Sequence, residues 1–97
     1  MLRRTKIVAT LGPVTEDPKV LDKLIEAGVD VVRLNFSHDL PEVHVKRAET
    51  ARNRAEAHGR EIGVLVDLQG PKIRTGKFKN GSVTLSEGAR FVIDASL

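Results

Sequence analysis

Apolar and polar positions along the first part of the chain predict short strands separated by helices. Residues 6–11 form a brief apolar run that ends at Gly12, as expected for a buried strand. Similar runs cover residues 29–37 and 61–69. The last run is apolar almost throughout, which is typical of a parallel strand that is covered on both faces.

A helix is predicted between the first two strands. Asp17 can cap its amino end, and Pro18 suits its first position, where a backbone N–H is not needed. Gly28 is a natural stop at its carboxyl end. The apolar stripe of this helix consists of Val20, Leu21, Leu24 and Ile25.

A second, weaker amphipathic pattern runs from Pro41 to His58 and ends at Gly59. We expect both histidines of this helix, His44 and His58, to lie on the surface. The face that packs on the sheet is expected to consist of Val43, Ala48, Ala51 and Ala55.

Strands and helices that alternate with short connections predict a parallel sheet with right-handed crossovers. Three such strands leave apolar faces and two open edges, so we expect further strands to complete the sheet and the chain to be a fragment. An open doubly wound sheet and an eight-stranded barrel would both do so. We favour the barrel because the third strand leads directly into a different kind of structure. The predicted fold is α/β, the first three βα units of a TIM (β/α)8 barrel.

The pattern changes after the third strand. Asn80 and Gly81 separate two short alternating segments, and this dipeptide is a strong hairpin signal. A second turn at Gly88 leads into another alternating segment. We therefore expect residues 1–71 to belong to the barrel domain and residues 72–97 to begin an antiparallel β module.

Composition and charge exclude several classes of protein. The chain has no cysteine and three aromatic residues, all Phe, so it offers neither a disulfide framework nor a thiolate metal site. No apolar run is long enough to span a membrane, and we expect a cytoplasmic protein with no membrane partner. The net charge is +3, but basic and acidic residues are interleaved and stacking aromatics are scarce. We therefore expect no nucleic-acid partner.

The second strand carries the most informative polar residues. Alternation places Arg33, Asn35 and Ser37 on one face, at the carboxyl end of a parallel strand, where ligands bind in such folds. An arginine offers a planar fork for phosphate or carboxylate, and amide and hydroxyl oxygens can ligate a hard cation. The alternative is that these groups face a hydrated barrel end. We favour a functional role because such alternation is unusual in a buried parallel strand.

The third strand ends at Asp67, a carboxylate that needs a cationic partner wherever it is buried. Its candidate partners are a bound metal, Arg33, Lys72 and Arg74. A purely structural ion pair is the alternative interpretation. His38 follows the polar face of the second strand and can either contact a ligand or cap the next helix. Thr10, on the same face of the first strand as Lys6, is a weaker candidate for the site.

Three stretches of the chain resemble the opening motifs of the pyruvate kinase family, of the bacterial type, in that family's order and spacing. They are residues 5–13 (TKIVATLGP), 31–38 (VVRLNFSH) and 67–76 (DLQGPKIRTG). The resemblance covers the entire chain, and three motifs of this length are highly specific. It implies that the three strands open a catalytic barrel and that Lys72 onward opens a β-barrel lid domain, inserted after the third strand.

The resemblance also implies roles for individual residues. The family counterpart of Arg33 binds the phosphate of phosphoenolpyruvate. The monovalent-cation site matches Asn35, Ser37, Asp67 and the backbone carbonyl of Leu68. Nucleotide-contacting positions match Asn35, Phe36, Ser37, His38 and Arg74.

The implied reaction is phosphoryl transfer from phosphoenolpyruvate to ADP in glycolysis, giving pyruvate and ATP. Mg²⁺ and K⁺ are the implied cofactors, and the implied full-length protein is a homotetramer. In the family, the catalytic lysine and the Glu and Asp that hold Mg²⁺ lie downstream. We therefore expect no catalytic residue in this chain and no activity from the chain alone.

Two features distinguish this chain within the resemblance. Leu68, Gln69 and Lys72 resemble the branch of the family that works without K⁺, which makes the Lys72 ammonium a candidate substitute for the ion. Asp39 stands where family members usually have Gly. Because Asp tolerates unusual backbone angles better than most residues, we expect the turn to survive this change.

Two other functions remain as alternatives. A different phosphate-handling TIM-barrel enzyme, such as an aldolase-type lyase, would need a lysine or a carboxylate pair in place of Arg33, Asn35 and Ser37. A free-standing anion- or RNA-binding module is the second alternative. Steeply salt-dependent RNA binding would support it.

Overall fold

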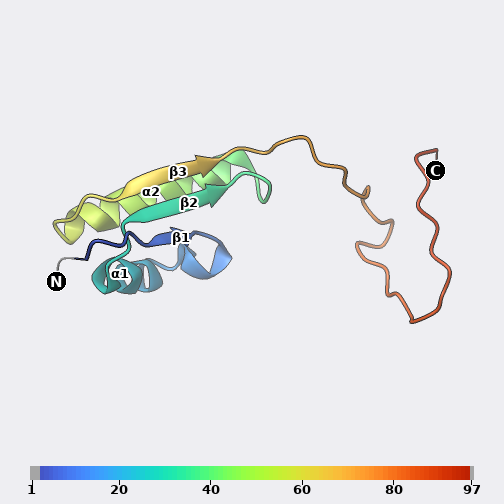
Figure 1. Cartoon of the computed structure of the whole chain (residues 1–97), viewed down its shortest axis with the longest axis horizontal. Coiled ribbons are helices and arrows are strands. Elements are labelled where there is room, and N and C mark those ends of the chain that lie inside the picture. The colour runs from blue at the N-terminus through green and yellow to red at the C-terminus, as the bar shows by residue number, and fades with distance from the viewer. Residues whose placement is uncertain (1–2, 97) are drawn as a thin grey trace.

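Three parallel strands form the sheet of this computed structural model, which describes residues 3–96 (Figure 1). β2 (Val31–Asn35) is central, with β1 (Val8–Thr10) on one side and β3 (Gly63–Asp67) on the other. The α/β class and the parallel pairing are confirmed. Each strand is shorter than its apolar run predicted, because apolar residues at the strand ends lie beyond the paired positions.

The first connecting helix begins and ends where its capping residues predicted. α1 (Pro18–Ala27) starts with Asp17, whose carboxylate accepts a hydrogen bond from the Lys19 N–H at 2.9 Å. Gly28 ends it with a φ of 104°, a left-handed conformation that glycine adopts without steric cost.

The remaining helical segments are α2 (Pro41–Ala57) and a short 3₁₀ helix, η1 (Pro13–Glu16), between β1 and α1. The bounds of α2 agree with its predicted range to within one residue. η1 was not predicted; its Thr15 hydroxyl accepts a hydrogen bond from the Gly12 N–H at 2.9 Å and donates one to the Gly12 carbonyl at 3.0 Å. No described helix is both long and apolar enough to span a membrane.

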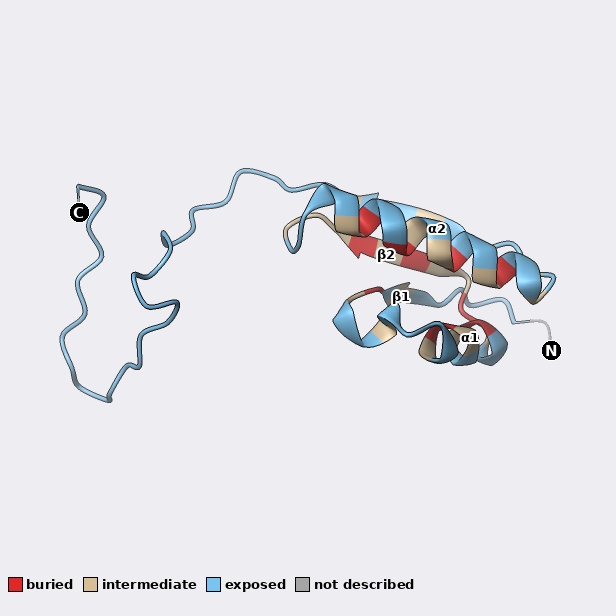
Figure 2. Ribbon diagram, turned by 180° about the vertical axis from the view of Figure 1, so that it is seen from behind, coloured by how far each residue is buried: buried red, intermediate tan, exposed pale blue. Residues whose placement is uncertain are grey.

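One face of the sheet packs against α1 and α2, and the core lies between them (Figure 2). The buried apolar residues are Leu11, Leu21, Ile25, Val29, Val32, Leu34, Ala51 and Ala55. The opposite face is open, since Val8 and Leu65, which lie on the same face as Arg33, are 53% and 43% exposed. An uncovered apolar face is what the sequence predicts for three strands without the further strands that would complete the sheet, because both helices lie on the same side.

The buried face of α2 also differs from its prediction. His44 is 1% exposed and Arg47 is 7% exposed, and both share this face with Ala51 and Ala55. His44 was expected on the surface, but its position places the ring against the end of β2. His58 is half-buried and bonds the Asp22 carboxylate at 3.2 Å, so it is not a free surface residue either.

Residues 68–96 contain no helix or strand (Figure 1) and are exposed throughout (Figure 2). The predicted antiparallel strands are therefore absent, although both predicted turns are present. The Gly81 N–H donates to the Phe78 carbonyl and the Ala89 N–H to the Ser86 carbonyl, each at 3.0 Å. A two-stranded hairpin is marginal in water without further strands to pack against. The division into residues 1–71 and 72–97 remains a prediction.

The open sheet generates a first testable prediction. A chain of residues 1–97 on its own exposes one edge of β1, one edge of β3 and an uncovered apolar face, so we expect it to self-associate. Static light scattering should report species larger than a monomer, and amide exchange should be slow in β2 and fast in residues 68–96. A monomer with one sharp cooperative melt would contradict this.

Candidate functional site

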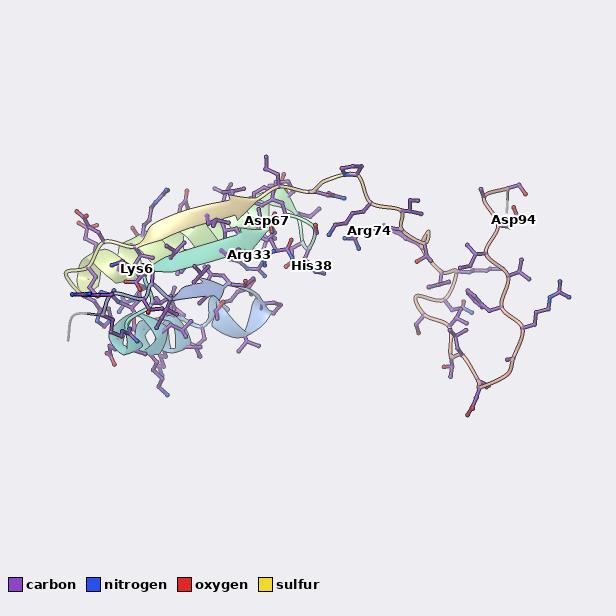
Figure 3. The ribbon with its side chains drawn as sticks, in the orientation of Figure 1. Lys6, Arg33, His38, Asp67, Arg74 and Asp94 are labelled. Carbon is purple, nitrogen blue, oxygen red and sulfur yellow. The ribbon has the colours of Figure 1, made fainter. Side chains whose placement is uncertain are left out.

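The carboxyl ends of the three strands bring polar side chains together. Thr10 is in register with Arg33, and Asn35 with Asp67. The Arg33 guanidinium donates to the Thr10 hydroxyl at 3.1 Å from Nη1 and to Asp67 Oδ2 at 3.1 Å from Nε, while Nη2 also contacts Oδ2. Figure 3 shows Arg33 and Asp67 together at this end of the sheet. Of the candidate protein partners of Asp67, Arg33 is the one that pairs with it.

The Arg33–Asp67 pair is half-exposed, with 31% and 46% of the two side chains accessible. An ion pair this open adds at most about 1 kcal/mol to stability. Its main effect is to orient the guanidinium, which is bonded to residues of β1 and β3 at once. The Arg33 side chain is therefore held in place and still accessible to a ligand.

The backbone after β2 turns tightly around Asn35. The Asn35 Oδ1 accepts a hydrogen bond from the Ser37 N–H at 3.1 Å, and its carbonyl accepts one from the His38 N–H at 3.1 Å. The Ser37 hydroxyl accepts a hydrogen bond from Lys72 Nζ at 3.0 Å. Lys72 thus bonds one of the predicted cation-binding residues, and it is not the partner of Asp67 that the sequence also allowed.

The predicted cation site has a suitable set of donor atoms. Amide, hydroxyl, carboxylate and carbonyl oxygens are the ligands that hard cations prefer. Two of these oxygens already bond cationic side chains: Ser37 Oγ bonds Lys72, and Asp67 Oδ2 bonds Arg33. Among residues 3–96, no cluster of three or more His, Cys, Asp or Glu side chains forms a metal site.

Phe36 and His38 point to different surroundings. The Phe36 ring packs against the core and stacks on His44, with ring centroids 4.6 Å apart. His38 is exposed, and it does not cap α2, because the cap is Leu40 and makes no side-chain hydrogen bond. Of the two roles considered for His38, ligand contact is the one left open.

Helix α2 holds the turn after β2 from behind, through contacts that the sequence analysis missed. His44 Nε2 bonds the His38 carbonyl, while His44 Nδ1 is buried without a described partner. Arg47 donates to Asp39 Oδ2 at 2.9 Å and to Glu16 Oε1 at 2.8 and 3.2 Å. The spacing of His44 and Arg47 relative to Ala51 and Ala55 was the available signal, and their polar character obscured it.

The electrostatics around Arg47 agree with this geometry. The Arg47 hydrogen bond holds the pKa of the Asp39 carboxyl below its usual value. Burial lowers the pKa of Arg47, but its hydrogen bonds to Asp39 and Glu16 together raise the pKa by more than burial lowers it, so the net shift is upward. Asp39 and Arg47 are therefore both charged at neutral pH.

Two predicted site residues do not join the cluster. Arg74 lies on the extended segment away from Arg33, His38 and Asp67 (Figure 3). The Leu68 side chain is 74% exposed, and the residue follows Asp67 directly at the end of β3.

A cavity of about 470 Å³ lies away from this cluster and is lined by Arg3, Lys6, Asp30 and Arg60 among others. Its arginines are occupied by structural bonds. Arg3 Nη2 donates to the Gly28 carbonyl at 2.9 Å, and Arg60 Nη1 donates to the Ile25 carbonyl at 2.6 Å. These bonds satisfy carbonyls at the end of α1. The cavity therefore belongs to helix capping and does not compete with the cluster at the carboxyl ends.

Comparisons with known proteins agree on one family. Residues 2–96 match the barrel domain of pyruvate kinase. The chain is 51% identical to pyruvate kinase of Haemophilus influenzae and 54% identical to pyruvate kinase II of Salmonella typhimurium, covering 99% of this chain in both cases. A crystal structure of Cryptosporidium parvum pyruvate kinase superposes with a TM-score of 0.77 at 40% identity, over 82% of this chain and 17% of that one. The chain spans 20% of the length of the two bacterial relatives.

Proposed function

Because the chain belongs to the pyruvate kinase family, we propose that it is the N-terminal segment of an enzyme that phosphorylates ADP with phosphoenolpyruvate. In this reaction the bond between phosphorus and the enol oxygen breaks, and a bond between phosphorus and a β-phosphate oxygen of ADP forms. The released enolpyruvate takes up a proton to give pyruvate. The segment contributes binding groups at the carboxyl ends of the first three strands.

The observation that carries this proposal is the geometry of Arg33. Its guanidinium is bonded to Thr10 and Asp67 from the two neighbouring strands, yet its side chain remains 31% exposed. A planar fork held in this way suits a phosphoryl group, whose charge spreads over several oxygens. In our proposal Arg33 binds the phosphate of phosphoenolpyruvate and stabilises the charge on the group as it moves.

The neighbouring turn supplies the proposed nucleotide contacts. The turn that leads from β2 to α2 follows Asn35, the last residue of β2, at the same edge of the sheet as Arg33. It contains Phe36, Ser37 and His38. The exposed His38 side chain and the backbone of this turn are the groups open to ADP, because the Phe36 ring is turned toward the core. Arg74 would join them only if residues 72–97 fold over this edge as the start of a lid domain.

Mg²⁺ would be held by residues outside this chain, and when bound it would neutralise phosphate charge during transfer. For the monovalent cation we propose that Lys72 takes the place of K⁺. Support comes from the 3.0 Å hydrogen bond between Lys72 Nζ and Ser37 Oγ, because Ser37 is one of the proposed cation ligands. An ammonium at that oxygen supplies a positive charge where a free ion would otherwise bind.

The complete enzyme that we propose is a cytoplasmic homotetramer. The support is the family membership of the chain, since none of its described contacts involves a second copy. Its described residues supply the first three strands and the first two helices of the proposed (β/α)8 barrel, and the proposed lid domain begins after Pro71.

We predict that residues 1–97 alone catalyse no phosphoryl transfer. The proposed Mg²⁺ ligands and catalytic lysine lie outside this segment, and charge neutralisation by metal dominates such chemistry. A coupled assay of pyruvate formation on highly purified chain should read background. Turnover that follows the chain through two chromatographic steps would contradict the prediction.

Arg33 provides the test of the proposed function in a full-length pyruvate kinase that carries this segment. Arg33→Ala should lower kcat/KM for phosphoenolpyruvate by a factor that corresponds to about 3 kcal/mol of lost transition-state stabilisation, because a charge-assisted contact to the reacting phosphate is lost. Arg33→Lys should also be impaired, since a point charge cannot bond the phosphate, Thr10 and Asp67 together. Near-normal steady-state kinetics in both variants would show that Arg33 has only a structural role.

Lys72 generates a separate prediction for the same full-length enzyme. The parent should turn over in buffer with Mg²⁺ but without Na⁺ or K⁺, because the Lys72 ammonium is already present at Ser37. Lys72→Glu should make activity depend on added K⁺, since the new carboxylate adds charge that a bound ion would offset. A parent that is inactive without millimolar K⁺ would reduce Lys72 to a surface charge.

A further inference from the structure

Arg47 is a buried cation among the described residues, and its two partners come from two different loops. Its side chain is 6% exposed, and it reaches from α2 to Glu16 in η1 and to Asp39 in the turn after β2. Both loops follow strands at the carboxyl edge, where Arg33 lies. The Glu16 and Asp39 side chains are 52% and 41% exposed, so the buried member is the guanidinium, which would be left unpaired if both carboxylates moved away. This contact therefore constrains both loops.

Asp39 needs such a constraint because its backbone is unfavourable for the residue. Its φ is 59°, and it is the one described residue other than glycine with a positive φ. This left-handed conformation costs a residue with a Cβ atom roughly 1 kcal/mol, and glycine adopts it freely. The Arg47 bond to Asp39 Oδ2 therefore offsets the strain of placing Asp at this position.

We propose that Arg47 is a positioning residue for the nucleotide: by holding Asp39 in its left-handed conformation, it sets the direction of the Ser37–His38 backbone. His44 supports the same turn one helical turn earlier, since its ring bonds the His38 carbonyl and stacks on Phe36. The first half of the buried face of α2 therefore fixes a turn at the carboxyl edge. This inference rests on the proposed function, because it assigns that turn to ADP.

The same helix contains a matched control. Arg54 also forms a two-point ion pair, with Asp22 in α1 at 2.6 and 2.8 Å. That pair joins α1 to α2 and contacts neither the turn after β2 nor η1. The loss of either arginine should lower stability, but only the loss of Arg47 should affect nucleotide binding.

The test compares variants of the full-length enzyme that carries this segment. Arg47→Met should raise KM for ADP about tenfold, with kcat and the KM for phosphoenolpyruvate changed less than about twofold, because uniform binding of ADP is lost. Arg54→Met should lower the melting temperature and leave both KM values unchanged. In an Asp39→Gly background, Arg47→Met should raise KM for ADP less than about threefold, because glycine adopts the left-handed conformation without strain and no longer needs the ion pair to offset it.

Two results would overturn the inference while leaving the proposed function intact. One is an active parent in which Arg47→Met raises both KM values equally or lowers only the melting temperature. The other is an equally large rise in the KM for ADP with and without Asp39→Gly. If Arg47→Met does not fold, Arg47→Lys serves instead, since it keeps the charge and loses one of the two partners. A wild-type full-length enzyme that does not phosphorylate ADP overturns the proposed function and this inference together.

Discussion

The central strand β2 must bury Val32 and Leu34 against the two helices, and the remaining geometry depends on this constraint. Side chains along a strand alternate, so the polar residues between and after these two must face the other way. A shift of one residue would bury Arg33 and expose Leu34. Parallel pairing on both edges of β2 then brings Thr10 and Asp67 to the same end of the sheet. The core thus determines where the polar cluster forms.

Features set by neighbouring residues could be predicted from the sequence. Asp17, Pro18 and Gly28 mark the ends of α1 through local hydrogen bonds and backbone angles. Alternation placed Arg33 and Asn35 on one face of β2. Features set by distant residues could not be predicted in the same way. The partner of Asp67 remained one of several candidates, because it depends on the register between β2 and β3.

The incorrect predictions have similar physical causes. His44 and Arg47 occupy core positions of α2 by spacing, but an imidazole and a guanidinium can be buried only when partners from other elements satisfy them. Those partners lie in loops that no local pattern describes. The expected hairpin around Gly81 likewise needs strands to pack against, and residues 68–96 have none among the described contacts. A short local signal was sufficient to form the turn, whereas a strand pairing requires a partner surface.

The hydrogen bond between Lys72 and Ser37 affects how far the proposed enzyme depends on the ions in the surrounding medium. A diffusing ion occupies its site according to its concentration in the surrounding medium, whereas a covalently attached ammonium has a fixed effective concentration, on the order of millimolar or more for a short flexible link. Lys72 also stands at the start of residues 72–97, so one bond both supplies a charge and attaches that segment to the end of β2. On the proposed role, charge balance at this edge would not follow fluctuations in cellular salt, and docking of the following segment would be coupled to completion of the site.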